Sequence, residues 1–343
     1  MLLLWLWGSA GLVFAMAIIG AITRLTESGL SIMEWNVFAG TFPPLSQAEW
    51  DRLFETYKLT GEYQKQHLSA LEMDGFKQIF WWEYIHRLWG RLIGMAFLIG
   101  LIVFAVARLR GGWAEHRWLM PHAIVGFLLI CFQGFLGWYM VSSGFDTELV
   151  DVSAYRLAAH LGLAVVIFIY FVGLGARVRL GGARGFAPAT LWSLPSLLVV
   201  LIFITLVSGA FVAGLNAGLI YNEFPTMGGA LVPADYQNGL PWFRNPFENP
   251  AAAQLHHRAF ASISALIVIG AAIWIVRQQG ASPAVRWWAW AALIVVIGQY
   301  VLGIVTLLYA VPIPLGAAHQ GGALTLLATL TVLRAHNNQA KLG

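Results

Sequence analysis

The chain has 343 residues, of which 59% are hydrophobic and only 10% are charged, and its mean hydropathy is +0.71. Soluble domains carry about 25% charged residues, so this composition predicts a polytopic membrane protein and excludes a dinucleotide-binding α/β enzyme, a disordered chain and a secreted disulfide scaffold. The net charge of +4 does not indicate nucleic-acid binding, because Lys and Arg gather in short segments between apolar runs. The single cysteine, Cys131, excludes an internal disulfide.

Eight apolar runs are long enough to cross a bilayer, whose hydrocarbon core needs about 20 residues of helix. The runs are continuous rather than alternating, which favours helices over a transmembrane barrel. We therefore expect an all-α protein with eight transmembrane helices. The runs lie near residues 4–23, 80–107, 118–141, 155–176, 191–213, 254–276, 286–308 and 315–334.

Basic residues mark one side of the expected membrane protein. They follow the second, fourth and eighth runs and flank the connection between the sixth and seventh. Because Lys and Arg accumulate on the cytoplasmic side, we expect an integral inner-membrane protein with both termini in the cytoplasm and external loops at 31–78 and 216–253. These basic residues are Arg108, Arg110, Arg117, Arg177, Arg179, Arg184, Arg277, Arg286, Arg334 and Lys341.

The first external loop contains a helix start signal. Ser46 and Glu49 have the S-x-x-E spacing of a capping box and precede Trp50 and Tyr57. We expect a short amphipathic helix on the outer surface, without a catalytic role. The second loop is rich in proline, which predicts irregular coil.

The two halves of the chain share short motifs in the same order. Motifs that recur on corresponding runs predict two fused units of four helices. We expect two pseudo-symmetric four-helix bundles, over residues 1–185 and 186–343. The motifs are E-Y-I-H-R at 83–87 and Q-L-H-H-R at 254–258, Q-x3-G at 133–137 and 299–303, and A-A-H at 158–160 and 317–319.

The repeat gives each half two histidines, His86 and His160 in the first and His257 and His319 in the second. One intramembrane histidine is about as often structural as functional, but four in repeated pairs favour ligands. Two facing imidazoles in a four-helix bundle can supply both axial positions of a haem, whereas zinc usually takes three or four protein ligands. The repeat aligns His257, and not the adjacent His256, with His86.

All four histidines fall within the first two turns of runs that enter the membrane from outside. We therefore expect two haem sites side by side near the periplasmic surface. This placement suits chemistry on haem. It does not suit electron transfer across the bilayer, which would need one haem at each face.

The repeat breaks beside one histidine pair. Glu83 lies three residues before His86, on the same helix face, and its counterpart is the neutral Gln254. A carboxylate in a medium of low dielectric constant is often functional, so we assign catalysis to the first half. The alternative is a structural ion pair between Glu83 and Arg87 at i+4 spacing.

Three arginines follow these histidines on the same runs. Arg87, Arg91 and Arg258 are candidates to pair with haem propionates, because arginine binds carboxylates bidentately. The alternative is that their side chains reach toward lipid headgroups. Arg91 has Ser262 as its counterpart, so this part of the repeat is also asymmetric.

These residues lie in stretches that resemble the heme A synthase family. The resemblance spans nearly the whole chain in one order. The matching stretches are T-R-L-T-E-S-G-L-S at 23–31, G-F-K-Q-I-F-W-W-E-Y-I-H-R-L-W-G-R at 75–91, R-L-A-A-H-L-G at 156–162, V-A-G-L-N-A-G-L-I-Y-N-E-F-P-T-M at 212–227, H-R at 257–258, G-Q-Y-V-L-G-I-V-T-L-L at 298–308 and A-H-Q at 318–320.

The resemblance implies a reaction as well as a fold. The family oxidises the C8 methyl group of haem O to the formyl group of haem A, through an alcohol and a diol that loses water, for cytochrome oxidase assembly. By position, His86 and His160 would flank the substrate porphyrin, with Glu83 as the nearby acid. His257 and His319 would be the axial ligands of a permanent haem B.

The resemblance also implies partners: heme O synthase, which supplies the substrate, and cytochrome oxidase assembly factors. A homo-oligomer and the identity of the electron acceptor are left open. A branch of the family has a cysteine pair in the first external loop. This chain has none there, so the resemblance carries no thiol relay to it.

Two other functions use the same histidines. A di-haem b-type cytochrome that oxidises quinol would contain two haem B groups and neither haem O nor haem A. A transporter or assembly scaffold with structural histidines would contain no haem. The parallel repeat disfavours a transporter, since inverted repeats and broken helices are the commoner transporter features.

Overall fold

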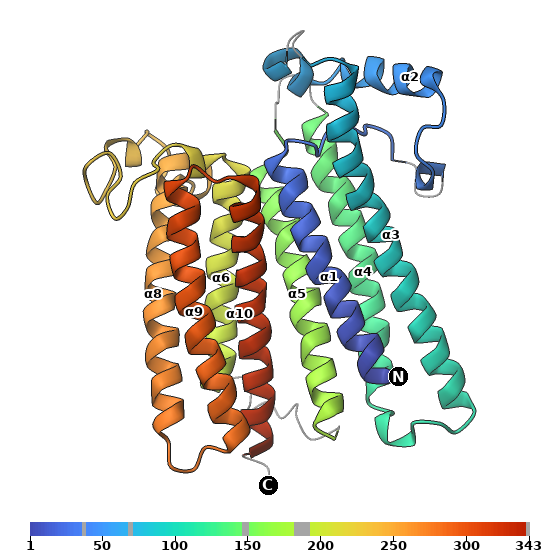
Figure 1. Ribbon diagram of the computed structural model, residues 1–343, viewed down its shortest axis with the longest axis vertical. Coiled ribbons are helices and arrows are strands. Elements are labelled where there is room, and N and C mark those ends of the chain that lie inside the picture. The colour runs from blue at the N-terminus through green and yellow to red at the C-terminus, as the bar shows by residue number, and fades with distance from the viewer. Residues whose placement is uncertain (36–38, 68–70, 146–150, 182–192, 341–343) are drawn as a thin grey trace.

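The computed structural model describes the chain except for residues 36–38, 68–70, 146–150, 182–192 and 341–343. Long helices running side by side dominate the described residues (Figure 1). Their bounds overlap the predicted apolar runs, and they end in loops at both ends of the molecule. They are α1 Leu2–Leu25, α3 Met73–Leu109, α4 Leu119–Val141, α5 Ala154–Arg179, α6 Leu194–Gly214, α8 Pro250–Arg277, α9 Pro283–Leu308 and α10 Ile313–Ala340.

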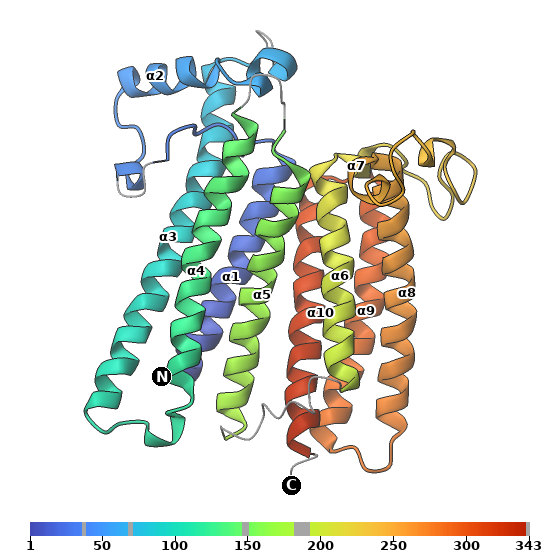
Figure 2. The same ribbon diagram turned by 180° about the vertical axis from the view of Figure 1, so that it is seen from behind.

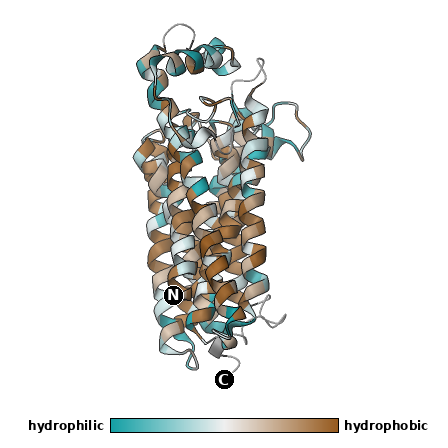
Figure 3. Ribbon diagram, turned by 90° about the vertical axis from the view of Figure 1, so that its right-hand side faces the viewer, coloured by the Kyte–Doolittle hydropathy of each residue, from teal (hydrophilic) through white to brown (hydrophobic). Residues whose placement is uncertain are grey.

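Seven of these helices are long and apolar enough to cross a membrane, which confirms a polytopic membrane protein. Leu128, Leu266 and Ile294 are more than half exposed on the helices, as lipid-facing residues would be. Figure 3 shows hydrophobic residues along the helices and hydrophilic residues mainly at their ends. The remaining long helix, α10, carries His319, Gln320 and several threonines, which lower its hydropathy.

The helices pack in two rings. In the first, α1 contacts α3 and α5, and α4 contacts the same two helices, so α3 and α5 lie on a diagonal. In the second, α6 contacts α8 and α10, and α9 contacts the same two, so α8 and α10 lie on a diagonal. The rings join where α1 packs on α10 and α5 packs on α6 and α10 (Figures 1 and 2).

One core runs through both rings. Leu6 of α1, Phe97 of α3, Phe171 of α5, Leu198 of α6 and Leu327 of α10 are all almost completely buried in it. Large buried side chains of this kind stabilise helix contacts in a membrane through close packing rather than through exclusion of water. The two rings of helices therefore share one core and pack directly against each other.

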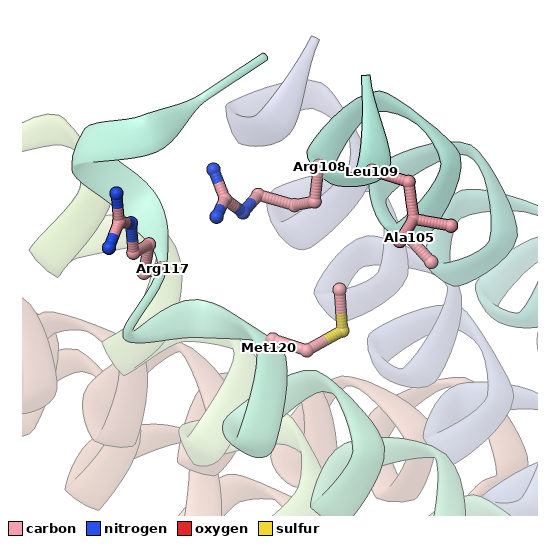
Figure 4. A pocket seen from close by; sticks show the side chains of 5 residues that line it. All are labelled: Ala105, Arg108, Leu109, Arg117 and Met120. Carbon is pink, nitrogen blue, oxygen red and sulfur yellow. The ribbon is translucent and has the colours of Figure 1, made fainter. Parts of the chain in front are cut away.

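The start of α1 and the end of α10 lie toward the same end of the helices, away from the short helices α2 and α7 (Figures 1 and 2). Most of the basic residues predicted to lie on one side are at this end, where α3, α5 and α8 finish. Arg184 and Lys341 lie outside the described residues. Arg108 and Arg117 also line an open pocket there, together with Ala105, Leu109 and Met120 (Figure 4).

The predicted helix of the first external loop is α2, Gln47–Tyr57. Its capping box is formed: the Ser46 hydroxyl accepts a hydrogen bond from the Glu49 N–H, and the Glu49 carboxylate accepts one from the Ser46 N–H. Its buried residues Phe54 and Tyr57 pack against Phe76 and other aromatic residues of α3. Aromatic contacts with α3 therefore hold α2 at the end of the first ring opposite the start of α1 (Figure 1).

This packing corrects one expectation. Because the first turns of α3 bind α2, the helix begins at Met73 and not near residue 80. His86 is thirteen residues after Met73, well beyond the first two turns, whereas His160, His257 and His319 lie within two turns of their helix starts.

Residues 216–253, predicted to form an irregular external loop, are not wholly irregular. They include two short 3₁₀ turns, Ala217–Leu219 and Ala234–Tyr236, and the one-turn helix α7, Asn245–Glu248. Asn249 then caps α8, because its side chain accepts a hydrogen bond from the Ala251 N–H.

Candidate functional site

The four predicted histidines lie on the diagonal helices of the two rings. His86 of α3 lies near His160 of α5 across the first ring of helices, and His257 of α8 lies near His319 of α10 across the second. Each of the four histidine side chains is only partly buried. The structure thus brings together the pairs that the repeat predicts, one in each half of the chain.

A glycine of a neighbouring helix faces each imidazole. A Cβ atom at Gly20 of α1 would lie 3.1 Å from Cε1 of His86, and one at Gly209 of α6 would lie 2.9 Å from Cε1 of His257. Gly137 of α4 and Gly303 of α9 face His160 and His319 in the same way, at 3.0 and 2.7 Å. The glycines therefore let the Cε1 edge of each imidazole approach the neighbouring helix closely.

Side-chain hydrogen bonds hold three of the four imidazoles. Gln133 Nε2 lies 3.1 Å from Nδ1 and 3.3 Å from Nε2 of His160, and Gln299 Nε2 lies 3.1 Å from Nδ1 of His319. Both amides also donate to the carbonyl oxygen of the histidine that they contact, at 2.9 and 2.8 Å. The recurring Q-x3-G motif therefore supplies both a hydrogen bond and a close-packing glycine to each histidine.

His257 has a different partner. Its Nδ1 is 2.9 Å from the hydroxyl of Ser208, and that hydroxyl donates to the Thr205 carbonyl at 2.6 Å. The hydroxyl therefore accepts from an Nδ1–H, which leaves Nε2 of His257 free of the ring proton. In contrast, Nδ1 of His86 is buried and has no hydrogen-bond partner among the described residues.

Glu83 is buried one turn before His86 and forms an ion pair with Arg87. Nη2 and Nε of Arg87 donate to Oε1 of Glu83 at 2.6 and 3.0 Å. Oε2 accepts from the Ser31 hydroxyl and from the Ile32 N–H, each at 2.7 Å. Arg87 also donates to the carbonyl oxygens of Ile32 and Glu34. The pair therefore clamps the segment that follows α1 onto α3.

The second half has the same clamp without the charge pair. Gln254 donates to the Tyr221 carbonyl at 3.1 Å. Arg258 donates to the carbonyl oxygens of Tyr221, Glu223 and Thr226 at 2.7 to 3.0 Å. Both arginines therefore hold the backbone that follows the first helix of their own ring, a role that the sequence did not indicate.

Two other predicted residues lie beside this machinery. Arg91 is one turn beyond Arg87 on α3 and is partly buried. Its counterpart Ser262 hydrogen-bonds Tyr300 of α9 at 2.9 Å. His256 contacts Tyr236 of the second external loop, with 3.3 Å between Nε2 and the hydroxyl, while His257 contacts α6. The structure thus separates the adjacent histidines as the repeat suggested.

A second carboxyl group is buried above the first ring. Glu62 accepts a hydrogen bond from the Tyr57 hydroxyl at 3.1 Å, and both residues are almost completely buried. Burial raises the pKa of Glu62 to about 8, and the negative charges of Glu83 and Glu27 add to this effect. Burial also raises the pKa of Tyr57 above its usual value. This pair was not predicted, because Glu62 lies in a polar stretch of the sequence without a recognisable motif.

The two histidine pairs fit a group that binds one imidazole on each of its two faces. Each pair faces inward from diagonal helices, and each ring is packed on one side by glycine yet remains partly accessible. Among the described residues, no cluster of three or more His, Cys, Asp or Glu side chains could hold a metal ion unaided. A haem, which needs two axial ligands, matches this donor set better than a metal bound by protein ligands alone.

Comparison with known proteins decides the family. The profile of the COX15-CtaA family, described as cytochrome oxidase assembly protein, matches residues 3–331. The chain belongs to the COX15-CtaA family. The resemblance to heme A synthases that the motifs indicated is thereby confirmed.

Curated relatives of this family are named heme A synthase. One from Rhodospirillum centenum is 46% identical over 335 residues, covering 95% of this chain and 85% of the relative. One from Nitrosospira multiformis is 44% identical and covers 94% and 89%. The Arabidopsis thaliana protein named heme A synthase COX15 is 41% identical and covers 96% and 73%. The COX15-CtaA match therefore extends over the helices that carry all four histidines.

Proposed function

We propose that this chain is a heme A synthase: an integral membrane oxidoreductase that converts the C8 methyl group of haem O into the formyl group of haem A, for cytochrome oxidase assembly. One observation carries the proposal. Two pairs of imidazoles lie on diagonal helices in a chain 41–46% identical to proteins named heme A synthase, and one pair has Glu83 beside it where the other has Gln254.

The chain is then two pseudo-symmetric bundles of four transmembrane helices each, with α10 as the eighth. Residues 1–185 form the substrate bundle and residues 186–343 the cofactor bundle. The boundary falls outside the described residues. Support comes from the matching ring order of the helices and from the matching glycine contacts of the histidines.

We assign haem O to the first bundle, between His86 and His160, and haem B to the second, between His257 and His319. Haem supplies an iron centre for redox chemistry when bound. The second pair suits a permanent cofactor, because the Ser208 hydroxyl accepts a hydrogen bond from Nδ1 of His257 and leaves its Nε2 able to bind iron.

We assign the acid–base role in the first bundle to Glu83. Its carboxylate is held in one orientation by Arg87, the Ser31 hydroxyl and the Ile32 N–H. A serine hydroxyl can donate or accept a hydrogen bond. Oε2 of Glu83 can therefore take up a proton if the Ser31 hydroxyl rotates from donor to acceptor.

Propionate pairing is assigned to Arg87, Arg91 and Arg258. Arg87 and Arg258 already hold backbone carbonyls, so a propionate would share a guanidinium with the loop that each clamps. Nε of Arg258 is buried without a partner among the described residues and is available for this contact. The loop and the haem edge would thus be bound by one side chain.

From the positive-inside rule we infer that the end of the bundle where α1 starts, α10 ends and most of the arginines lie is cytoplasmic. The histidine pairs then lie toward the periplasmic side of the inner membrane. Substrate supply by heme O synthase and product delivery to cytochrome oxidase assembly factors would occur from within the bilayer. Contact with these proteins, and a homo-oligomer, belong to the same proposal.

Expression in cells that make haem O but lack a native heme A synthase tests the function. Extracted haems should include haem A when the chain is present and none with the empty vector. Only haem B in the purified protein, with no haem A in the cells, would instead support the quinol-oxidising cytochrome. A protein without any haem would support a scaffold.

A further inference from the structure

The two bundles differ in how they hold equivalent histidines. His257 is bonded through Nδ1 to Ser208, whereas the buried Nδ1 of His86 has no hydrogen-bond partner among the described residues. The other two histidines have equivalent glutamine partners: Gln133 contacts His160, and Gln299 contacts His319. Only one position of the fourfold pattern is therefore without a hydrogen bond.

A single residue accounts for the difference. The glycines that face the two histidines, Gly20 and Gly209, set the register between α1 and α6, and the residues before them are Ile19 and Ser208. The same spacing also aligns the S-G-L and A-G-L motifs that follow these helices. Ile19 thus occupies the place of the hydroxyl that holds His257.

Space does not explain the contrast. A Cβ atom would lie 3.1 Å from the His86 ring at Gly20 and 2.9 Å from the His257 ring at Gly209. Both imidazoles therefore pack equally closely on the first helix of their bundle. They differ in the polar contact at Nδ1, which fixes the tautomer and rotation of a histidine.

A hydrogen bond donated by the second ring N–H strengthens a histidine ligand, and loss of its acceptor typically lowers metal affinity about 10–100-fold. We propose that His86 is the exchangeable ligand of the substrate bundle, and that Ile19 keeps it exchangeable by leaving its Nδ1 unbonded. The proposal rests on the assignment of haem O to this bundle. A small ligand of iron could then enter on the His86 side while His160 stays in place.

The cofactor bundle should behave in the opposite way. The Ser208 hydroxyl accepts a hydrogen bond from Nδ1 of His257, and the Gln299 amide packs against the His319 imidazole, so we expect neither axial position to open to a small ligand. The residue before the facing glycine, Ile19 in one bundle and Ser208 in the other, would therefore distinguish the substrate site from the permanent cofactor site.

Carbon monoxide binding to the reduced, purified full-length protein tests this proposal. The protein is made in cells that produce haem O, and extracted haems O and A report the substrate bundle while haem B reports the cofactor bundle. In the unsubstituted protein, carbon monoxide should shift the spectrum of haem O or A and leave that of haem B unchanged. Carbon monoxide binding to haem B alone, or equally to both, would overturn the proposal.

Reciprocal variants isolate the hydroxyl. Ile19→Ser should reduce carbon monoxide affinity in the substrate bundle at least tenfold, and Ser208→Ala should make haem B reactive. Ile19→Val removes bulk without adding a hydroxyl and should match the unsubstituted protein, while Ser208→Thr should keep haem B closed. If Ile19→Ser and Ile19→Val behave alike, the proposal is wrong. Absence of haems O and A from the unsubstituted protein would instead overturn the proposed function.

Discussion

Arg87 binds Glu83 across one turn of α3 with two hydrogen bonds, at 2.6 and 3.0 Å, and the same guanidinium holds the backbone of the segment after α1. Breaking the pair would therefore disturb a carboxylate and a loop together. This coupling means that a role for Glu83 in proton transfer must be tested separately from its role in structure.

Glu83→Gln should abolish haem A formation while leaving the protein folded. A glutamine carbonyl can still accept from the Ile32 N–H, as Oε2 does now, but the amide cannot take up a proton at neutral pH. The expected loss is about 10²–10⁴-fold, the usual contribution of a general acid or base. Haem extraction from cells measures it, and bound haem B in the purified variant reports folding.

The reverse change supplies the control. Gln254→Glu introduces a carboxyl group at the matching place in the cofactor bundle. It should leave haem A formation intact, because we assign no proton transfer to that side. Full haem A production by Glu83→Gln would remove this residue from the mechanism.

Arg87→Met should destabilise the protein by about 3–5 kcal/mol, since it leaves the Glu83 carboxylate buried and unpaired. Arg52→Met breaks an ion pair with Glu34 in which both side chains are more than one-third exposed. Its cost should be about 0–1 kcal/mol. Thermal unfolding of the two variants in detergent compares them, and equal losses would show that the clamp contributes no more than a surface ion pair.

Glycine substitutions test whether the imidazoles need the adjoining helix surface. Gly303→Ala would place a methyl group 2.7 Å from the His319 ring, so this ring must move and haem B content should fall about tenfold or more. In Gly298→Ala, on the same helix, the added methyl group meets no atom within 4 Å, so this variant should keep its haem B. Equal haem B content in both purified variants would show that His319 does not depend on this contact.

The same comparison is available in the substrate bundle. Gly137→Ala would place a methyl group 3.0 Å from the His160 ring, while Gly134→Ala on the same helix meets nothing within 4 Å. We expect loss of bound haem O, but not of haem B, in Gly137→Ala alone. Loss of both haems would indicate a general packing defect.

Glu62 should make the outer end of the first bundle sensitive to alkali. Its pKa is raised to about 8 in the folded protein, from about 4.5, so the folded state keeps a proton that the unfolded segment loses. Local stability is therefore greatest below pH 4.5, falls by at most about 1.4 kcal/mol per pH unit up to pH 8, and is level above that. Hydrogen exchange of α2 between pH 6 and 9 measures the fall.

A neutral side chain should remove this dependence. Glu62→Gln keeps a group able to bond the Tyr57 hydroxyl, and exchange corrected for its intrinsic rate should then vary little between pH 6 and 8. Glu55→Gln changes an exposed carboxylate on α2 and should leave the fall in place. A slope in Glu62→Gln equal to that of the unsubstituted protein would assign the effect to another group.

Most of the fold was predictable because apolar runs of membrane length leave few alternatives. The start of α3 was not, since Asp74, Lys77 and Gln78 interrupt the apolar run and the helix there depends on aromatic contacts with α2. Local polarity therefore misplaced the start of α3 and the number of helical turns before His86.

The candidate site was predictable as a set of histidines but not in its details. The i+4 spacing of Glu83 and Arg87 fits an ion pair and a reactive acid equally well, and only coordinates show the loop that both residues bind. Ser208 gave no signal, because its contact with His257 depends on how α6 and α8 are rotated toward each other. The sequence repeat therefore indicated the candidate histidines, whereas the residues that orient them depend on how the helices pack.

Haem identification in three purified proteins tests the central claim most directly: the unsubstituted chain, His86→Ala and His257→Ala, each made in cells that produce haem O. We expect haem B with haem O or A in the first. His86→Ala should retain haem B and form no haem A, and His257→Ala should lose haem B. A colourless unsubstituted protein, or the same haem composition in all three, would contradict the account.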